Sequence, residues 1–290
     1  MSSLYIHIPF CDHICAYCDF SKVMNNDWAN KYLDALEFEI RDKCIDESFD
    51  TIYIGGGTPS SLSIKEIEYL LALTNLLNIQ ELEEFTFECN IEDITEELLD
   101  LLTKFKVNRL SIGIESFDEE NLLLMKRKTD YKDAKRKMEL IRSKGFNNVN
   151  LDLIYALPGE KMSTLKKDIK LLLSLNPEHI STYSLMIEDN TFLNYKKVNN
   201  ISEEIDASMY EYICKKLSKP PYVCNGCPQK RVCTLSKQFY DAVYADKEYK
   251  ENLIESRTGI TYSKKEIENL NNILVPLIKE QKQSIHHAVI

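Results

Sequence analysis

Six short apolar segments alternate with stretches of helical periodicity between residues 4 and 217, and this alternation constrains the fold more than any other feature. Each segment is apolar or β-branched and is bounded by turn residues, as expected of strands. The predicted strands are Leu4–Ile8, Thr51–Ile54, Glu84–Glu88, Arg109–Ile112, Asn148–Leu153 and His179–Leu185. Between them apolar residues recur at helical spacing, for example from Trp28 to Ile40. This pattern predicts an α/β fold, a partial (β/α)6 TIM-like barrel whose ligands bind at the carboxyl ends of the strands.

The alternation stops near Leu217, after which the sequence continues with Lys219-Pro220-Pro221. Two adjacent prolines cannot continue a helix. We therefore expect a barrel over residues 1–217 and a small, mostly helical appendage over 218–290 without further strands. The appendage helices are expected around 235–253 and 264–278. The charge also changes at this boundary, because the chain from Lys219 onward carries 11 Lys and Arg against 8 Asp and Glu, a net charge of +3, whereas the whole chain carries −10.

Composition narrows the class of protein without identifying any chemistry. The 290 residues are 44% hydrophobic and 28% charged, as in ordinary globular proteins. The longest apolar runs, such as Leu70–Leu73, are far shorter than the ~20 residues of a membrane span. Residues 1–7 lack the basic and apolar regions of a signal peptide, so we expect a cytoplasmic protein. The net charge of −10 argues against a protein that coats nucleic acid, and only the basic appendage suits such a partner.

Three cysteines, Cys11, Cys15 and Cys18, lie close together directly after the first predicted strand. Soft sulfur ligands select zinc or iron–sulfur clusters. Structural zinc usually takes four ligands in two separated pairs, and this C-x3-C-x2-C triplet has no partner pair nearby. The spacing therefore favours a cluster held by three thiolates, with one iron open to another ligand. A zinc site and buried thiols remain the alternatives.

Polar groups follow the other strands at the same predicted edge of the sheet. Gly55-Gly56-Gly57-Thr58 follows the second strand, and its glycines can adopt positive φ and expose backbone groups to a polar ligand. A tight turn explains the same residues equally well. Glu88, Glu115 and Asp152 stand at or just after the ends of strands three to five. One such carboxylate usually caps the next helix, but three that face one cysteine loop predict a site for hydroxyl and ammonium groups.

Taken together, these motifs resemble the radical SAM superfamily, and within it the oxygen-independent coproporphyrinogen III oxidase-like group. Five motifs occur in order and at the expected separations. They are Tyr5 through Phe20, Gly55–Ser60, Glu88–Asn90, Arg109–Phe117 and Asn150–Gly159. The resemblance implies a barrel in which a reduced [4Fe–4S] cluster passes one electron to S-adenosylmethionine, and the resulting 5′-deoxyadenosyl radical abstracts a hydrogen atom from a substrate.

By this resemblance Cys11, Cys15 and Cys18 ligate the cluster, and S-adenosylmethionine binds at its open iron. The resemblance assigns no side chain a catalytic role. The positions that match cofactor contacts of the family are Tyr5, Tyr17, Gly56, Gly57, Thr58, Glu88, Glu115, Arg127 and Asp152. Glu115 departs from the family pattern, which usually has Gln at this position.

Within the group, Cys18-Asp19-Phe20 is similar to the haem chaperone HemW, because true oxidases have a further cysteine where this chain has Phe20. The resemblance implies haem or a porphyrin as ligand and respiratory proteins as haem acceptors. HemW proteins also carry a C-terminal His-Asn-x-x-Tyr-Trp segment for haem, which is missing here, since the only tryptophan is Trp28. We therefore expect a haem chaperone impaired in function. Oxidative decarboxylation of coproporphyrinogen III is the alternative.

The appendage after Leu217 is similar to the N-terminal region of a bacterial insertion-sequence transposase, ahead of and into a helix-turn-helix segment. This similarity implies a fusion or truncation product. Cys224, Cys227 and Cys233 fit a zinc site without its fourth ligand, an auxiliary iron–sulfur cluster, or free thiols. A non-functional chimera that carries a DNA-binding remnant is therefore a further reading of the chain.

Overall fold

The computed structural model describes residues 2–24, 26–79, 82–217, 253–255 and 261–263. By its contacts the chain divides into two units, one made mainly of Met1–Ser218 and one of Lys219–Val289. Within the described residues, no helix has the length and apolar character that crossing a membrane requires. The predicted cluster and cofactor residues all lie in the first unit.

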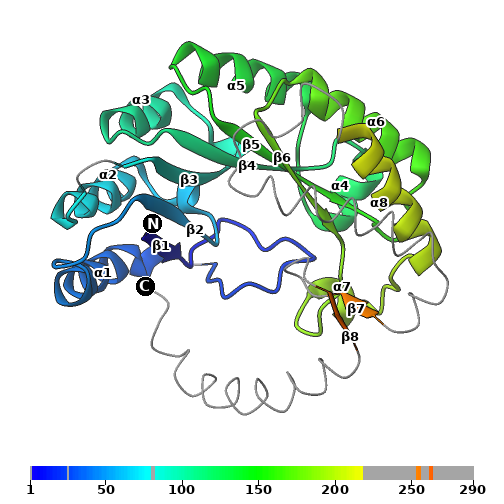
Figure 1. Ribbon diagram of the computed structural model, residues 1–290, viewed down its shortest axis with the longest axis horizontal. Coiled ribbons are helices and arrows are strands. Elements are labelled where there is room, and N and C mark those ends of the chain that lie inside the picture. Colours follow the sequence, from blue (N-terminus) through cyan, green and yellow to red (C-terminus); the bar gives the residue numbers. More distant parts are fainter. Residues whose placement is uncertain (1, 25, 80–81, 218–252, 256–260, 264–290) are drawn as a thin grey trace. The chain divides into compact units, whose positions relative to one another are not determined.

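The first unit contains a six-stranded parallel sheet in which the strands are neighbours in chain order (Figure 1). The strands are β1 Ser3–Ile8, β2 Thr51–Gly56, β3 Glu84–Asn90, β4 Arg109–Glu115, β5 Val149–Tyr155 and β6 His179–Ser184. Parallel neighbours joined by helices confirm the predicted α/β fold. Strands β3 and β5 run beyond their predicted ends, so that Glu88 and Asp152 lie inside strands and not at strand ends.

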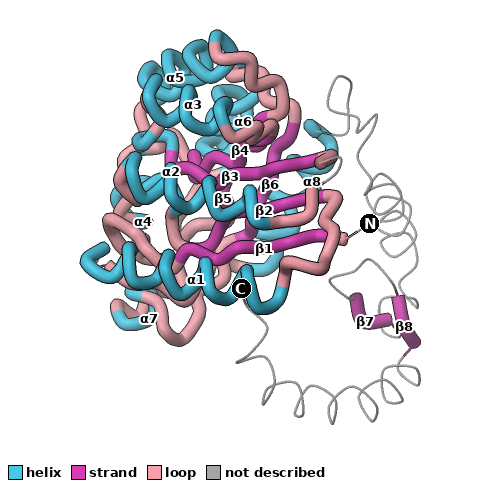
Figure 2. The backbone as a smooth tube through the Cα atoms, turned by 90° about the vertical axis from the view of Figure 1, so that its left-hand side faces the viewer, coloured by secondary structure: helices cyan, strands magenta, loops and turns pink. Residues whose placement is uncertain are grey.

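Helices connect the strands and cover one face of the sheet. They are α1 Ala29–Lys43, α2 Ile64–Leu73, α3 Glu96–Lys104, α4 Glu119–Met125, α5 Tyr131–Ser143, α6 Met162–Ser174, α7 Phe192–Tyr195 and α8 Glu203–Leu217, with single 3₁₀ turns at Asn26–Trp28, Pro59–Ser61, Thr74–Leu76 and Ile91–Asp93. Figure 1 shows α1, α2, α3, α5 and α6 in order along the outside of the sheet. Figure 2 shows α1, α2 and α3 as a layer over β1–β3.

Side chains ahead of the helices supply the caps that their first turns need. At α2, Ser63 accepts a hydrogen bond from the Glu66 backbone N–H at 3.4 Å, and the Glu66 carboxylate accepts one from the Ser63 N–H at 2.9 Å. Thr95 and Asp118 cap α3 and α4 in a similar way. Thr95 and Asp118 thus cap the helices that follow β3 and β4. The alternative in which Glu88 and Glu115 cap these helices is wrong.

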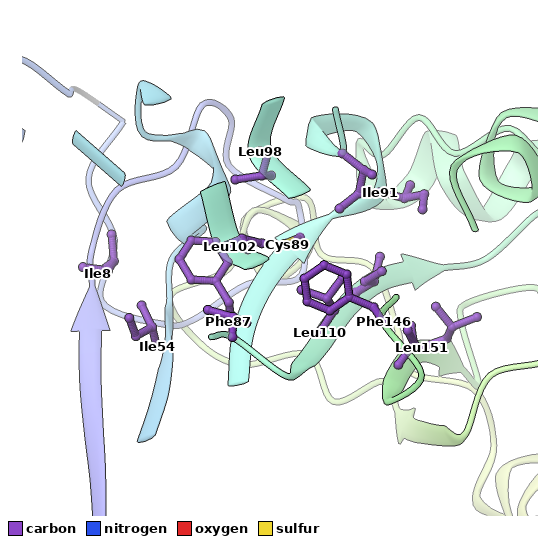
Figure 3. Packing of buried hydrophobic residues seen from close by; sticks show 14 of the residues in the cluster. Ile8, Ile54, Phe87, Cys89, Ile91, Leu98, Leu102, Leu110, Phe146 and Leu151 are labelled. Atoms are coloured by element: carbon purple, nitrogen blue, oxygen red, sulfur yellow. The ribbon is translucent and has the colours of Figure 1, made fainter. Parts of the chain in front are cut away.

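The sheet face toward the helices forms the hydrophobic core. Ile54, Phe87 and Leu110 come from three neighbouring strands and pack with Leu102 of α3 in one buried cluster (Figure 3). Because side chains alternate along a strand, every second strand residue lies on this face. Trp28 belongs to the predicted apolar stripe of the first helix, but it is 60% exposed, since it precedes α1.

The opposite sheet face carries the alternate strand residues, which point away from the core, and most of them are polar. We call this set the polar face. It consists of Tyr5, His7, Tyr53, Thr86, Glu88, Ser111, Asn150, Asp152, Ser181 and Tyr183. Three of the predicted cofactor contacts, Tyr5, Glu88 and Asp152, lie on this face, which presents hydroxyl, amide and carboxylate groups side by side across the six strands. Such a face suits a polar ligand more than a further helix layer.

In the second unit only β7 Leu253–Glu255 and β8 Thr261–Ser263 are described, and they pair in antiparallel fashion. The expectation of no strand after Leu217 is therefore wrong. Leu253-Ile254 and Thr261-Tyr262 are aliphatic, β-branched or aromatic pairs, which favour strands. The helices expected up to 252 and over 264–278 lie outside the described residues, as do Cys224, Cys227 and Cys233. The transposase-like identity of the appendage remains a prediction.

We predict that Leu102→Ala lowers the free energy of unfolding by about 3 kcal/mol, because Leu102 is fully buried and its loss leaves a cavity in the core. Urea unfolding followed by circular dichroism measures the change. Leu123→Ala is the matched control, since Leu123 is 81% exposed on α4 and its truncation should change stability by less than ~0.5 kcal/mol. Equal losses for the two variants would contradict the packing described here.

A second stability prediction concerns Glu160, which is buried before α6 and accepts a hydrogen bond from the Leu157 N–H at 3.1 Å. Burial raises the pKa of Glu160 from 4.5 to about 7. The folded state therefore holds a proton that the unfolded state releases, and stability falls as the pH rises from about 4.5 to about 7. Glu160→Gln should flatten this part of the stability profile, measured by urea unfolding across that range. An unchanged slope would refute the assignment.

Candidate metal centre and cofactor site

Residues 9–23, which we call the cysteine loop, leave the end of β1 and return to it. Phe10 and Val23 form an isolated bridge at the base of the loop. The Cys11 N–H donates to the Val23 carbonyl at 3.1 Å, and the Val23 N–H donates to the Pro9 carbonyl at 2.7 Å. These hydrogen bonds close the base of the loop and fix the backbone position of Cys11.

The tip of the cysteine loop is fixed at a second point, far from β1. The Ala16 N–H donates to the Met125 carbonyl at 3.0 Å, and the Ala16 carbonyl accepts from the Leu193 N–H at 3.1 Å. Ala16 is fully buried against Leu122, Met125 and Leu193. Because Met125 ends α4 and Leu193 lies in α7, the loop reaches from β1 to the segments that follow β4 and β6 (Figure 1).

The three loop cysteines are free thiols, and Cys11 and Cys15 have polar groups beside their sulfur atoms. The Thr58 hydroxyl donates to Cys11 Sγ at 3.5 Å, and Arg127 Nη1 donates to Cys15 Sγ at 4.0 Å. His13 Nε2 lies 3.7 Å from the same Cys15 sulfur. Burial raises the pKa of the Cys11 thiol, and the charges of Cys18 and Cys15 raise it further. The loop therefore gathers three soft sulfur ligands that repel one another when ionised and that a positive metal centre would stabilise.

This donor set fits an iron–sulfur cluster. All three ligands are sulfur, they come from one loop, and hydroxyl and guanidinium donors approach their sulfur atoms, as cluster thiolates accept hydrogen bonds. Within the described part of the chain, no three His, Cys, Asp or Glu side chains converge closely enough to hold a single metal ion.

The glycine turn after β2 lies directly against the cysteine loop. The Gly57 N–H donates to the Ile8 carbonyl, and the Thr58 N–H donates to the Phe10 carbonyl, both at 2.7 Å. A Cβ on Gly57 would lie 2.6 Å from the Phe10 oxygen and 3.0 Å from Cys11 Sγ. Gly56 has φ +119°, which side chains other than that of glycine rarely adopt. The glycines are thus required for the turn to approach the loop.

Glu88 on β3 points at this glycine turn. Its Oε2 accepts from the Gly56 N–H at 2.9 Å, and its Oε1 accepts from the Tyr53 hydroxyl. A Cβ on Gly55 would lie 2.6 Å from Glu88 Oε2, so this glycine also makes room for a close approach. Burial raises the pKa of Glu88, and these two hydrogen bonds oppose the rise. Glu88 therefore has a fixed orientation at the edge of the polar face.

Arg127 is the buried cation of the site, with a relative exposure of 5%. Its Nη1 donates to Asn90 Oδ1 at 2.7 Å, its Nη2 donates to the Gly113 carbonyl at 3.1 Å, and it pairs with Glu92 at 3.7 Å. Arg127 Nε is buried and has no hydrogen-bond partner among the described residues. A buried, unpartnered guanidinium N–H beside a cysteine sulfur suits an anionic ligand group such as a carboxylate.

Glu115 ends β4 next to Arg127, with a positive φ of 66° at the point where the pairing with β5 shifts register. Burial raises the pKa of Glu115 to about 7, and the charge of Arg127 opposes the rise. Tyr17 hydrogen-bonds to both Glu115 and Cys15, and burial raises its pKa well above the ordinary value. Tyr17 thereby connects the cysteine loop with the end of β4.

The remaining predicted residues lie on the polar face. Asp152 accepts from Asn150 Nδ2 at 2.7 Å, and burial raises its pKa. Tyr5 stacks its ring beside that of Tyr53 at 5.8 Å, and burial together with the charge of Glu88 raises its pKa to about 12. The negative charge of Asp152 acts on both Glu88 and Glu115. The twelve predicted site residues thus lie on the cysteine loop, in the glycine turn, on the polar face, at the end of β4 or just after α4.

Sequence reasoning missed several residues that hold the site together. Asn90 binds Arg127, and Tyr53 binds Glu88. Ala16 anchors the loop tip. The alternation along the predicted second strand, in which Tyr53 stands between the apolar Ile52 and Ile54, was a usable signal for a residue on the polar face. No comparable signal marks Ala16, because its role depends on tertiary partners.

Several known proteins are similar in sequence to this chain. A family model for the radical SAM superfamily matches residues 5–172. A protein of Lactococcus lactis named heme chaperone HemW is 41% identical over 227 residues, which cover 76% of this chain and 60% of the relative. An oxygen-independent coproporphyrinogen III oxidase of Salmonella typhimurium is 31% identical over 204 residues, which cover 68% of this chain and 45% of the relative.

One solved structure shows the same architecture. Coproporphyrinogen III oxidase (HemN) of Escherichia coli, described as a radical SAM enzyme, has a TM-score of 0.71 and 26% identity, with 81% of this chain and 58% of that chain covered. The chain spans about 60% of the length of the Lactococcus relative. The cofactors of the matched superfamily are a [4Fe–4S] cluster and S-adenosylmethionine, and the sulfur set described above fits them. This chain belongs to the radical SAM superfamily.

Proposed function

We propose that this chain is a radical SAM protein of the haem chaperone type, with a [4Fe–4S] cluster on Cys11, Cys15 and Cys18. One observation carries the cluster assignment: the cysteine loop is tied at its base to β1 and at Ala16 to Met125 and Leu193. A loop held at both ends presents its three thiols in a set geometry, as a bound cluster requires.

The proposed cofactor is S-adenosylmethionine at the open iron of the cluster. When bound, the reduced cluster supplies one electron for reductive cleavage of the sulfonium. The Arg127 guanidinium, with its unpartnered Nε, would bind the methionyl carboxylate. Glu88, fixed by Gly56 and Tyr53, would accept hydrogen bonds from the methionyl ammonium group. The proposed contacts are completed by Tyr5, Tyr17, Gly56, Gly57, Thr58, Glu115 and Asp152.

Charge supports this placement. Glu88, Glu115 and Asp152 each have a pKa raised first by burial, and the charge of Asp152 raises the pKa of both Glu88 and Glu115 further. A ligand with an ammonium group and hydroxyl donors would relieve this concentration of buried carboxylates. Arg127 is the buried cation beside the cluster ligand Cys15 and would pair with the one anionic group of the same ligand.

Two features favour haem handling over porphyrin oxidation. The chain is 41% identical to the Lactococcus haem chaperone and 31% identical to the Salmonella oxidase. Phe20 stands where the oxidases have a further cysteine, and its ring, which is 71% exposed, cannot ligate a metal. We propose haem or a porphyrin as the bound cargo and respiratory proteins as its acceptors.

We predict that Cys15→Ala abolishes the [4Fe–4S] signal. Anaerobic reconstitution with iron and sulfide, followed by reduction and EPR, should give a cubane spectrum for the unaltered chain and none for the variant, because two thiolates cannot hold a cubane stably. Cys214→Ala is the matched control, since Cys214 is an exposed cysteine on α8, outside the cysteine loop. A cluster signal that persists in Cys15→Ala, or that is absent from the unaltered chain, would refute the assignment.

We also predict that the cluster-loaded protein binds haem and does not decarboxylate coproporphyrinogen III. Anaerobic titration with haem should produce a saturable Soret change. Incubation with coproporphyrinogen III, S-adenosylmethionine and a strong reductant should leave the tetrapyrrole unchanged in product analysis by liquid chromatography. Release of the decarboxylated product without any haem binding would instead establish the oxidase alternative.

A further inference from the structure

A chain of hydrogen bonds crosses the polar face from β6 to β3 and ends on Glu88. Ser181 Oγ donates to Asn150 Oδ1 at 3.0 Å, and Asn150 Nδ2 donates to Ser111 Oγ at 3.0 Å. Ser111 opposes the rise in the pKa of Tyr53, as a hydroxyl that donates to the Tyr53 oxygen does, and the Tyr53 hydroxyl donates in turn to Glu88 Oε1. The four donors come from four different strands, β6, β5, β4 and β2.

All members of this chain donate in the same direction, toward Glu88. An amide N–H that donates to a hydroxyl oxygen strengthens the hydroxyl as a donor to its own acceptor, so the bonds reinforce one another. Ser111 is 5% exposed and Asn150 is 1% exposed, so water competes little for their groups. The chain therefore delivers a strong hydrogen bond to the carboxylate at its end.

The same amide group also holds the second carboxylate of the polar face. Asn150 Nδ2 donates to Asp152 Oδ1 at 2.7 Å as well as to Ser111. Ser181, which donates to Asn150 Oδ1, is the register partner of Asp152 on β6. Asn150 thus connects Asp152 with the path to Glu88, although the two carboxylates are two strands apart and repel each other.

The two oxygens of Glu88 leave little freedom for its side chain. Oε1 accepts from the Tyr53 hydroxyl and Oε2 accepts from the Gly56 N–H, while Gly55 closes one side, because even a Cβ there would lie 2.6 Å from Oε2. Removal of the Tyr53 hydroxyl would free one oxygen to rotate away from the glycine turn. The orientation of Glu88 therefore depends on the Tyr53 hydroxyl, which does not itself need to contact the ligand.

We propose that Tyr53, Ser111, Asn150 and Ser181 are positioning residues for S-adenosylmethionine, which act through Glu88 and Asp152. This inference rests on the proposed function, since it takes the cofactor to bind at these carboxylates. Tyr53 holds Glu88 in the orientation that accepts from the methionyl ammonium group. Asn150 donates both to Asp152 and to Ser111. It therefore helps to fix the positions of the Asp152 and Glu88 carboxylates relative to each other before the ligand binds.

The test is Tyr53→Phe in the cluster-loaded, anaerobic protein. We expect the affinity for S-adenosylmethionine, measured by equilibrium dialysis, to fall about tenfold, because a charge-assisted hydrogen bond is lost while the ring stays. Iron content and the EPR spectrum of the reduced cluster without ligand should stay unchanged. The matched control is Tyr69→Phe, which removes a tyrosine hydroxyl that donates to Glu37 at 2.7 Å between α2 and α1, away from the polar face.

A double-mutant cycle separates positioning from direct contact. Glu88→Gln should weaken cofactor binding on its own, and the addition of Tyr53→Phe to Glu88→Gln should cost less than about twofold more, because the two residues act as one unit. Ser111→Ala should give a smaller loss than Tyr53→Phe, with a melting temperature close to that of the unaltered chain.

The outcomes distinguish the inference from the function on which it rests. Full cofactor affinity in Tyr53→Phe, or a tenfold loss that persists in the Glu88→Gln background, would overturn the positioning role and leave the proposed function standing. Failure of the unaltered, cluster-loaded chain to bind S-adenosylmethionine would overturn the proposed function and the inference with it.

Discussion

The backbone hydrogen bonds of Ala16 to Met125 and Leu193 are the constraint on which the site depends. A loop of this length that was fixed only at β1 would leave Cys15 and Cys18 to sample many positions, at an entropic cost on binding a cluster. With its tip buried between the segments after β4 and β6, the loop brings Cys15 to Arg127, and Tyr17 to Glu115. The ends of strands far apart in the sequence thereby share one site.

The parallel sheet supplies the second half of this arrangement. Because β1 to β6 are neighbours in chain order, polar residues on adjacent strands can come within hydrogen-bonding reach, as Ser111 and Asn150 do. The glycines of the β2 turn allow close approaches, such as that between Gly57 and the Phe10 carbonyl. The loop and the polar face are thus two surfaces that meet at the carboxyl ends of the strands, where α/β folds bind ligands.

Much of this fold follows from local patterns. Strand alternation and helical spacing predict the six βα units, and the Cys11–Cys18 spacing predicts a cluster loop. The errors arise where local pattern and tertiary pairing differ. Glu88 and Asp152 are predicted at strand ends, whereas pairing with neighbouring strands extends β3 and β5 to Asn90 and Tyr155. The roles of Tyr53, Asn150 and Ala16 could not be predicted, because each depends on a partner on another strand or helix.

The central claim is that one iron of a cluster on this loop is open and binds S-adenosylmethionine. Mössbauer spectroscopy of the protein reconstituted anaerobically with ⁵⁷Fe tests it most directly. The account predicts that one iron site of the [4Fe–4S] cluster changes its quadrupole doublet when S-adenosylmethionine is added, while the other sites, held by Cys11, Cys15 and Cys18, do not. A cubane whose iron sites all stay unchanged on addition of the ligand, or a spectrum without any cubane, would contradict it.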